Sequence, residues 1–381
     1  MGSVLSRAQI ALQALAQLRN TYSTLHKRLQ LSPGLPVANP TQPLWTYPPV
    51  HLPSEDQSGD LPDYADVVVI GSGITGTSVV YNLLSRESGL KIVMLEARGV
   101  CSGATGRNGG HINPPLYHDY EELKDKHGER VAKVMVAFRR AHLIEVQRIA
   151  EEEGILKESQ VRETEHLDVF ECPKTFAESK AKLEAWRAAM PVESSTFVAY
   201  ERDEAIKLPA GEHELMFGGG WAQACDDGLP EIGIADDAAV NHTSQSYLAG
   251  ALPQYFGLEN WGAEAVVEDG GEAGEGSVKW GAGRTKAQWS GILGISADLL
   301  PWVGRVPAKL SGRTPPTSLV RPSPAQEHGS RKSGEGGGSS ALAHMVLDRE
   351  EEIREWFPDI MRVTEKRWKE AQFDNLIAKF M

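Results

Sequence analysis

Hydrophobic residues around position 70 follow a strand–helix–strand pattern. Residues 66–70, Asp-Val-Val-Val-Ile, form an apolar run that predicts a strand buried on both faces, as parallel strands are. Residues 91–95, Lys-Ile-Val-Met-Leu, predict a second strand. Between them, residues 77–86 place apolar side chains at helical spacing: Val79, Val80, Leu83 and Leu84. This order predicts an α/β fold that begins with a parallel β-α-β unit.

Later periodic segments predict a long helix and a further strand. Residues 129–153 have an amphipathic period, with an apolar stripe of Val131, Val134, Met135, Phe138 and His142. We interpret His142 on this stripe as a packed histidine rather than a catalytic base. Residues 165–170 alternate in polarity and predict a strand, and Thr175 with Glu178 matches a capping box at the start of the next helix.

The N-terminal segment differs in charge from the rest of the chain. Residues 1–54 contain no Asp or Glu, and residues 8–30 predict an amphipathic helix, followed by an extended lead-in over 31–64. Three interpretations stay open. The helix packs on the folded body, or it is a mitochondrial presequence, or the start Met-Gly-Ser-Val-Leu-Ser is a myristoylation signal with Gly2 as the acceptor.

Composition narrows the class of protein. The chain has 381 residues and a formal net charge of −13, so clustered phosphate contacts with nucleic acid are not expected. No apolar run approaches the length of a membrane-spanning helix. The three cysteines, Cys101, Cys172 and Cys225, are too few and too irregular for a disulfide framework or a structural zinc site. We therefore expect an intracellular protein, cytoplasmic unless one of the N-terminal signals operates.

A glycine fingerprint follows the first predicted strand. In Gly71-Ser72-Gly73-Ile74-Thr75-Gly76, the first glycine permits a tight turn, the second lets a pyrophosphate approach the backbone, and the third lets the helix pack on the strand. The helix N-terminus offers N–H groups to phosphates. Glu96 lies 20 residues after Gly76, at the end of the second strand, where a carboxylate binds a ribose diol. The strand, helix and acid together favour a dinucleotide site over a glycine-rich turn without a ligand.

The loop after Glu96 favours FAD over NAD. Residues 98–111 are dominated by Gly, Ala, Ser and Thr, which leave backbone N–H groups uncovered for an anion or a flat ring. An NAD-binding domain has no use for such a loop at this place. An NAD-dependent dehydrogenase remains as an alternative.

At this point residues 65–110, with GSGITG, LEAR and CSGATGRNGG, resemble the D-amino-acid oxidase-like family of FAD-dependent oxidoreductases. That family includes glycine and sarcosine oxidases and oxidases of γ-glutamylated polyamines, and the likeness is strongest to fungal members of the last type. The resemblance implies a glutathione-reductase-type, Rossmann-like FAD domain. It also implies FAD contacts from Gly71, Ser72, Gly73, Ile74, Thr75, Gly76, Glu96, Ala97, Arg98, Ser102, Gly103, Ala104, Thr105, Gly106, Arg107, Asn108, Gly109 and Gly110.

The resemblance also bears on how the cofactor is attached. In the members that bind FAD covalently through histidine, that histidine aligns with Arg107. The chain has no histidine there, so we expect non-covalent FAD, with His111 as a loop residue near the flavin. Trp289 and Trp302 either line the flavin pocket or are buried aromatic residues of no special role.

The chain departs from the family at two places. Residues 208–211 lead directly to a stretch, 214–221, that resembles a late strand of the family's substrate sheet, so a long block is missing. A polar, glycine-rich segment that predicts disorder also stands where the family has a glycine-rich turn beside the flavin. We expect these parts: 1–64 N-terminal helix and extended lead-in, 65–155 N-terminal part of the FAD domain, 156–285 incomplete α+β substrate domain, 286–310 return to the FAD domain, 311–340 disordered linker, and 341–381 helices up to Met381.

By resemblance, the expected function is oxidation of a C–N bond in a small amine or amino acid. A hydride passes to flavin and then to oxygen, which gives peroxide. The cofactor carries the chemistry, so no metal and no catalytic triad is expected. No catalytic residue is assigned, because the substrate sheet is incomplete. A non-catalytic remnant or incomplete gene product of the family is the competing hypothesis.

Overall fold

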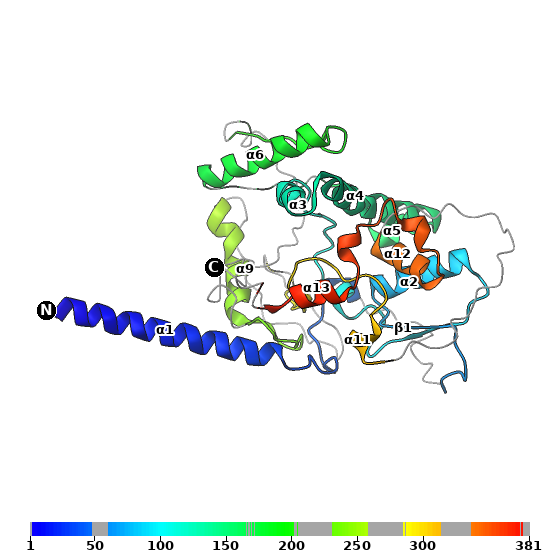
Figure 1. Cartoon of the computed structure of the whole chain (residues 1–381), viewed down its shortest axis with the longest axis horizontal. Helices are drawn as coiled ribbons and strands as arrows, with labels where there is room; N and C mark the ends of the chain where they lie inside the picture. Colours follow the sequence, from blue (N-terminus) through cyan, green and yellow to red (C-terminus); the bar gives the residue numbers. More distant parts are fainter. Residues whose placement is uncertain are drawn as a thin grey trace, which may run out of the picture. The chain divides into compact units, whose positions relative to one another are not determined.

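The computed structural model of the chain (Figure 1) describes residues 2–47, 60–164, 166, 168, 170, 172–201, 204, 231–257, 285, 287–313, 337–373 and 375. The chain divides into two compact units. Unit 1 comprises residues 1–60, 96–109 and 215–295, and unit 2 comprises residues 61–95, 110–214 and 296–381. The predicted FAD domain over 65–155 thus has residues in both units, and the predicted domain limits stay a prediction.

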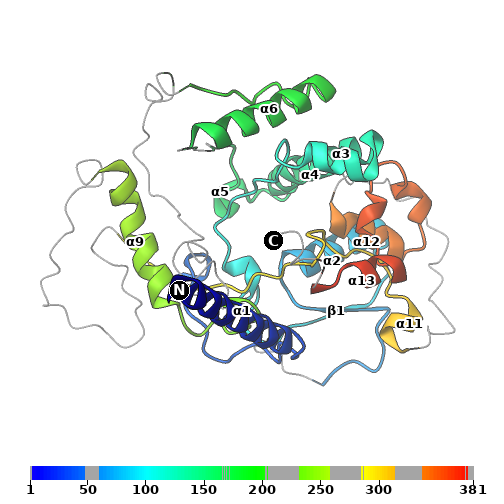
Figure 2. The ribbon, with the colours of Figure 1, turned by 60° about the vertical axis from the view of Figure 1, so that its left-hand side comes forward.

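Unit 2 contains the predicted β-α-β element. β1 (Val67–Ile70) and β2 (Ile92–Leu95) pair in parallel, with Val67 opposite Ile92 and Ile70 opposite Leu95, and α2 (Ile74–Arg86) connects them. Helix α12 (Gly338–Val346) lies beside α2 in both views (Figures 1 and 2). The two helices share a small core of Val79, Leu83, Ala343 and Leu347, against which Val67 and Ile92 pack.

The burial expected for the first strand is wrong on one face. Val68 and Ile70 are 55% and 86% exposed, whereas Val67 and Val69 are half-buried. The cause is the small size of the sheet, which has two strands among the described residues, and helix α2 covers only the face that carries Val67. The apolar run therefore predicted the strand correctly, but the prediction that both of its faces are buried is wrong.

The larger core of unit 2 is helical. It contains α3 (Tyr120–His127), α4 (Glu129–Glu152), α6 (Pro173–Ala189) and the short helices η5 (Glu350–Ile353) and η6 (Asp359–Met361). These elements bury large side chains such as Tyr120, Met135, Trp186, Ile353 and Phe357. The predicted helix over 129–153 is confirmed as α4. His142 in α4 has its Nδ1 2.8 Å from the carbonyl oxygen of Phe138 and its ring edge-on to that phenyl ring, so it is a packed histidine.

Other predictions for unit 2 need correction. Helix α6 begins with Cys172 as its N-cap, without a side-chain bond, and Thr175 lies inside the first turn, where its hydroxyl donates to the Cys172 carbonyl. The capping box is therefore wrong. Helix α13 covers Glu365–Glu370 and is followed by a break at Ala371 and Gln372, after which Phe373 and Asn375 are helical; the rest of the predicted final helix lies outside the described residues. The predicted strand over 165–170 has no regular structure at His166, Asp168 and Phe170, and its other residues lie outside the described ones.

The predicted linker over 311–340 has regular structure at both ends. Helix α11 (Ala308–Ser311) includes its first residue, and α12 begins at Gly338. Residues 314–336 lie outside the described residues, as does the predicted strand over 214–221. The short helix α5 (Leu156–Ser159) follows α4.

Unit 1 contains α1 (Gly2–Leu29), η1 (Leu44–Thr46), η3 (Ala104–Gly106) and α9 (His242–Phe256). Helix α1 confirms the predicted N-terminal helix. It packs on the rest of unit 1 at its C-terminal end, where Leu25 is buried and Arg28 donates to the carbonyl of Ile232. Toward its start the apolar side chains of Ile10, Leu12, Leu15 and Leu18 are exposed. None of the described helices is both long and apolar enough to cross a membrane.

Candidate functional site

The glycine turn of unit 2 joins β1 to α2. Gly71 has a φ of +94°, which strongly favours glycine, and its N–H donates to the carbonyl of Leu95 at 2.7 Å. Gly76 has no room for a side chain, because a Cβ there would lie 2.1 Å from the carbonyl oxygen of Gly71. The roles predicted for the first and third glycines of the fingerprint in the backbone are therefore confirmed.

The start of α2 fits a phosphate group. The 13-residue helix has Gly73 as its N-cap, with extended backbone (φ −65°, ψ 173°), and no side chain caps it. Its first backbone bond runs from the Thr77 N–H to the Gly73 carbonyl at 3.0 Å. Glycine at the N-cap brings no side chain to the end of the helix, and the positive pole of a helix attracts anions. The described residues thus fit the pyrophosphate of a dinucleotide, and Gly71–Gly76 would hold it.

Glu96 follows β2 in the chain and belongs to unit 1. Its side chain is exposed, and its Oε1 accepts from the backbone N–H groups of Ala97 at 2.8 Å and Arg98 at 3.2 Å. These bonds fold the carboxylate over the next two residues and fix its direction. An exposed carboxylate of fixed direction is suited to bind a ribose diol.

The loop that follows Glu96 is compact. Ser102 donates its backbone N–H to Gly99, and η3 continues to Arg107, whose N–H donates to Ala104 at 3.1 Å. The Oγ of Ser102 is buried and has no hydrogen-bond partner among the described residues. A buried hydroxyl without a partner is unfavourable unless a further group satisfies it. This orphaned atom also fits a loop that receives a polar ligand.

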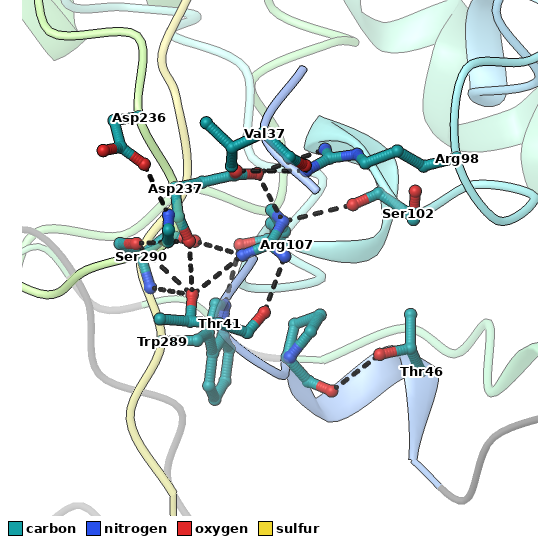
Figure 3. A network of polar contacts seen from close by, with 12 residues as sticks. Val37, Thr41, Thr46, Arg98, Ser102, Arg107, Asp236, Asp237, Trp289 and Ser290 are labelled. Carbon is teal, nitrogen blue, oxygen red and sulfur yellow. Dashed lines mark hydrogen bonds and ion pairs between the residues drawn. The ribbon is translucent and has the colours of Figure 1, made fainter. Parts of the chain in front are cut away.

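Arg107 forms the centre of a polar network in unit 1 (Figure 3). Its side chain is 2% exposed. Nη1 donates to Thr41 Oγ1 at 2.9 Å and to the Ser290 carbonyl at 2.8 Å, and Nη2 donates to the Thr41 carbonyl at 2.6 Å. Nε lies 3.1 Å from the Ser102 carbonyl and 3.0 Å from Asp237 Oδ2. The guanidinium of Arg107 is therefore bound by the protein itself.

Asp237 joins Arg107 to Arg98. Arg98 binds the same carboxylate through Nη1 to Oδ1 at 3.1 Å and Nη2 to Oδ2 at 3.2 Å, a two-point contact. Burial alone would raise the pKa of Asp237, but the Arg98 hydrogen bond and the charges of Arg107 and Arg98 lower it below its ordinary value. Burial in turn lowers the pKa of Arg107, which Asp237 opposes. The carboxylate is thus the counterion of both arginines.

Sequence reasoning missed Asp237, Thr41 and Ser290. Asp237 and Thr41 belong to no motif, Ser290 lies in the predicted return stretch, and the three lie 139, 66 and 183 residues from the arginines they contact. The two tryptophans, for which the sequence left two interpretations open, have different partners. Whether either lines the flavin pocket stays a prediction. Trp289, in unit 1, donates its Nε1 to the Arg107 carbonyl at 3.0 Å, whereas Trp302, in unit 2, stacks under the Arg367 guanidinium at 3.9 Å.

Unit 2 holds a second polar cluster that the sequence did not indicate. Asp168 accepts from Tyr117 Oη at 2.7 Å and lies 3.3 Å from His118 and 3.0 Å from His166. Burial and the bond to Asp168 raise the pKa of Tyr117 above its ordinary range.

His111 lies in an exposed loop. In the part of the chain that the structure describes, no group of three or more His, Cys, Asp or Glu residues could hold a metal ion.

The predicted contact residues therefore fall into two sets. Gly71–Gly76 and Gly110 belong to unit 2, and the others, Glu96–Arg98 and Ser102–Gly109, belong to unit 1. Gly71–Gly76 are consecutive and form the turn from β1 to α2, whereas Gly110 lies 34 residues further along the chain.

Comparison with known proteins shows what the segment that contains the glycine turn is similar to. Residues 66–228 match the family model of the FAD dependent oxidoreductases (DAO). The chain is similar to gamma-glutamylputrescine oxidoreductase of Escherichia coli (strain K12), with 36% identity over 70 residues, which is 18% of this chain and 16% of that protein. It is also similar to the tRNA 5-methylaminomethyl-2-thiouridine biosynthesis bifunctional protein MnmC of Maricaulis maris (strain MCS10), with 40% identity over 65 residues, 17% of this chain and 11% of that protein.

The chain thus spans less than a fifth of the length of these two relatives, and no solved structure matches it. The family match decides between the two cofactors considered from the sequence, in favour of FAD. Residues 66–228 are thus similar to the FAD-dependent oxidoreductases.

Proposed function

We propose that this protein binds FAD and oxidises a C–N bond of a small amine or amino acid, with oxygen as the electron acceptor. The single observation that carries the cofactor part is the turn from β1 to α2. A glycine of positive φ, an uncapped helix start and a glycine without space for a Cβ lie within the segment that matches the family.

The substrate class rests on the relatives. The name of one contains a putrescine derivative, and the name of the other contains a methylaminomethyl group. Both names thus describe carbon bonded to an amine nitrogen, which supports an amine or amino acid as the substrate here. We therefore propose the chemical class of the substrate, an amine or amino acid.

Each part of the chain has a proposed task. Gly71–Gly76 bind the pyrophosphate through the helix start, and Glu96 accepts hydrogen bonds from the adenosine ribose. The loop over 102–110 lies beside the flavin and presents backbone N–H groups and the Ser102 hydroxyl. When bound, FAD supplies the acceptor for the substrate hydride. Because Arg107 stands where the histidyl-flavin members of the family carry their histidine, we propose that the attachment of FAD is non-covalent.

An absorbance spectrum of the purified protein, followed by FAD titration, tests the cofactor assignment. We expect the spectrum of bound flavin, and we expect denaturation to release the flavin from the protein. Gly73→Val should abolish binding, because a side chain at the N-cap excludes the pyrophosphate. Gly89→Ala is the matched control, since a Cβ there meets no atom within 4 Å. Wild-type FAD occupancy in Gly73→Val would refute the fingerprint assignment.

A peroxide assay tests the reaction. Amino acids, N-methylated amino acids and polyamine derivatives should be offered to the flavin-loaded protein. Turnover with any of these classes supports the proposed oxidation. Bound FAD without turnover across all three would favour the competing hypothesis of a non-catalytic remnant, which the absence of family-like blocks around residues 208–211 and 311–340 motivates.

A further inference from the structure

The loop over residues 98–107 has an arginine at each end, and both arginines bind one carboxylate. Arg98 and Arg107 contact Asp237 at 3.0 to 3.2 Å, and Asp237 is 3% exposed (Figure 3). We propose that Asp237 is a positioning residue for FAD: by neutralising Arg98 and Arg107 it closes this loop into the conformation that receives the cofactor. This inference rests on the proposed function.

Burial is what makes the carboxylate necessary. The Arg107 side chain is 2% exposed and that of Arg98 is 15% exposed. A buried guanidinium without a counterion is strongly unfavourable, so without Asp237 the two arginines would turn toward water. Since they are the ends of the loop, their movement would change the path of every residue between them. Among these are Ser102 to Gly106, which are expected to contact FAD.

Closure by one residue also lowers the entropy of the loop. Joining the two ends of a segment of about ten residues removes most of its open conformations. The side chain of Arg107 strengthens the closure by turning back on its own loop, with Nε 3.1 Å from the Ser102 carbonyl. Backbone bonds within the loop, such as Ser102 N–H to the Gly99 carbonyl and Gly106 N–H to the Gly103 carbonyl, shape its interior. The contacts of the two arginines with Asp237 join its ends.

The lead-in before the glycine fingerprint supplies the second layer of this arrangement. Thr41 donates its N–H to the Asp237 carbonyl at 2.8 Å and accepts from Arg107 through both its carbonyl and its hydroxyl. The carbonyl of Val37 accepts from Arg98 at 3.2 Å. Trp45 donates its Nε1 to the Asn108 carbonyl at 2.8 Å. Residues 37–45 thus belong to the support of the loop.

The test compares Asp237→Asn with Asp236→Asn. The two substitutions remove the same charge from adjacent residues, but Asp236 is exposed and its carboxylate bonds only locally, to the Ala238 N–H at 2.8 Å. FAD affinity is measured by fluorescence titration below the melting temperature. The loop is probed separately in FAD-free protein, by the rate of tryptic cleavage after Arg98 and Arg107.

We expect Asp237→Asn to weaken FAD binding by at least about tenfold, the equivalent of one charge-assisted hydrogen bond, and to speed cleavage at both arginines. Asp236→Asn should leave both measurements unchanged. Asp237→Glu keeps the negative charge and should recover most of the affinity, which a general loss of stability would not explain. If Asp237→Asn does not fold, Thr41→Val removes the hydroxyl that accepts from Arg107 and contacts Ser290 and the Asp237 carbonyl, and it should show a smaller loss in the same direction.

Wild-type FAD affinity in Asp237→Asn, or in Thr41→Val where the former does not fold, would overturn the inference and leave the proposed function intact. Failure of the wild-type protein itself to bind FAD would refute the proposed function and, with it, the role of Asp237 toward the cofactor. Faster cleavage in Asp237→Asn would then still show that the carboxylate holds the loop.

Discussion

The glycine turn over 71–76 and the loop over 98–108 are held by different kinds of interaction. The turn is made of backbone: a positive φ at Gly71, a close approach at Gly76 and a helix that starts without a capping side chain. The loop is made of side chains: a buried carboxylate, two arginines and Thr41. The comparison teaches that a backbone turn is encoded within six residues, whereas an ion-paired loop depends on residues far away in the chain.

The largest expected effect is a loss of stability when the loop over 98–107 loses its buried carboxylate, on which the glycine turn does not depend. Asp237→Ala leaves two buried guanidinium groups without a counterion, and we expect the free energy of unfolding to fall by about 3–5 kcal/mol. Urea unfolding measures it. Asp236→Ala, at an exposed position, should stay within about 0.5 kcal/mol of wild type. A similar loss in both variants would mean that the network of Arg107 does not stabilise the loop.

The next largest effect is on FAD affinity and concerns Glu96, which lies between the turn and the loop in the sequence. Glu96→Ala should weaken FAD binding by about 1.5–3 kcal/mol, the usual value of a hydrogen bond to a charged group. Titration of FAD measures the dissociation constant, and Glu158→Ala, an exposed carboxylate on α5, serves as the control. An unchanged dissociation constant would remove Glu96 from the site.

A smaller effect tests the backbone turn by itself. Gly76→Ala places a Cβ 2.1 Å from a backbone carbonyl oxygen, so strand and helix must separate, and the cost of such overpacking is about 1–3 kcal/mol. Gly89→Ala adds the same atom where nothing lies within 4 Å. Unfolding free energies should therefore differ between the two variants. If they agree, the close approach at Gly76 is not required.

The smallest effect is a dependence on pH. The pKa of Asp237 is lower in the folded protein than its ordinary value of 3.8, because the Arg98 bond and the two positive charges outweigh burial. A group with a depressed folded pKa contributes stability above its unfolded pKa, and this contribution is lost as the pH falls toward the folded value. Stability should therefore decline below about pH 5, and less steeply in Asp237→Asn. Equal slopes in the two proteins would show that the carboxylate titrates normally.

Local pattern alone was sufficient for the elements around the turn. The apolar runs predicted β1 and β2, and the period of apolar residues predicted α2 and α4, because side-chain spacing follows directly from backbone geometry. The same local pattern failed where the environment mattered. Val68 and Ile70 were expected to be buried, yet they face outward, since burial depends on how many strands and helices surround a strand. Thr175 failed as a cap because Pro173 already begins the helix.

For the candidate site, the sequence by itself determined the glycine turn and the position of Glu96, which lie within one short stretch of chain, and the resemblance to FAD-dependent oxidoreductases that the family match supports. Whether the individual residues contact FAD stays a prediction. Only the tertiary structure decided that the Arg107 side chain faces inward and that Asp237, Thr41 and Ser290 surround it. The physical reason is that steric limits act between neighbouring residues, whereas a buried charge takes its counterion from whichever segment the fold brings next to it.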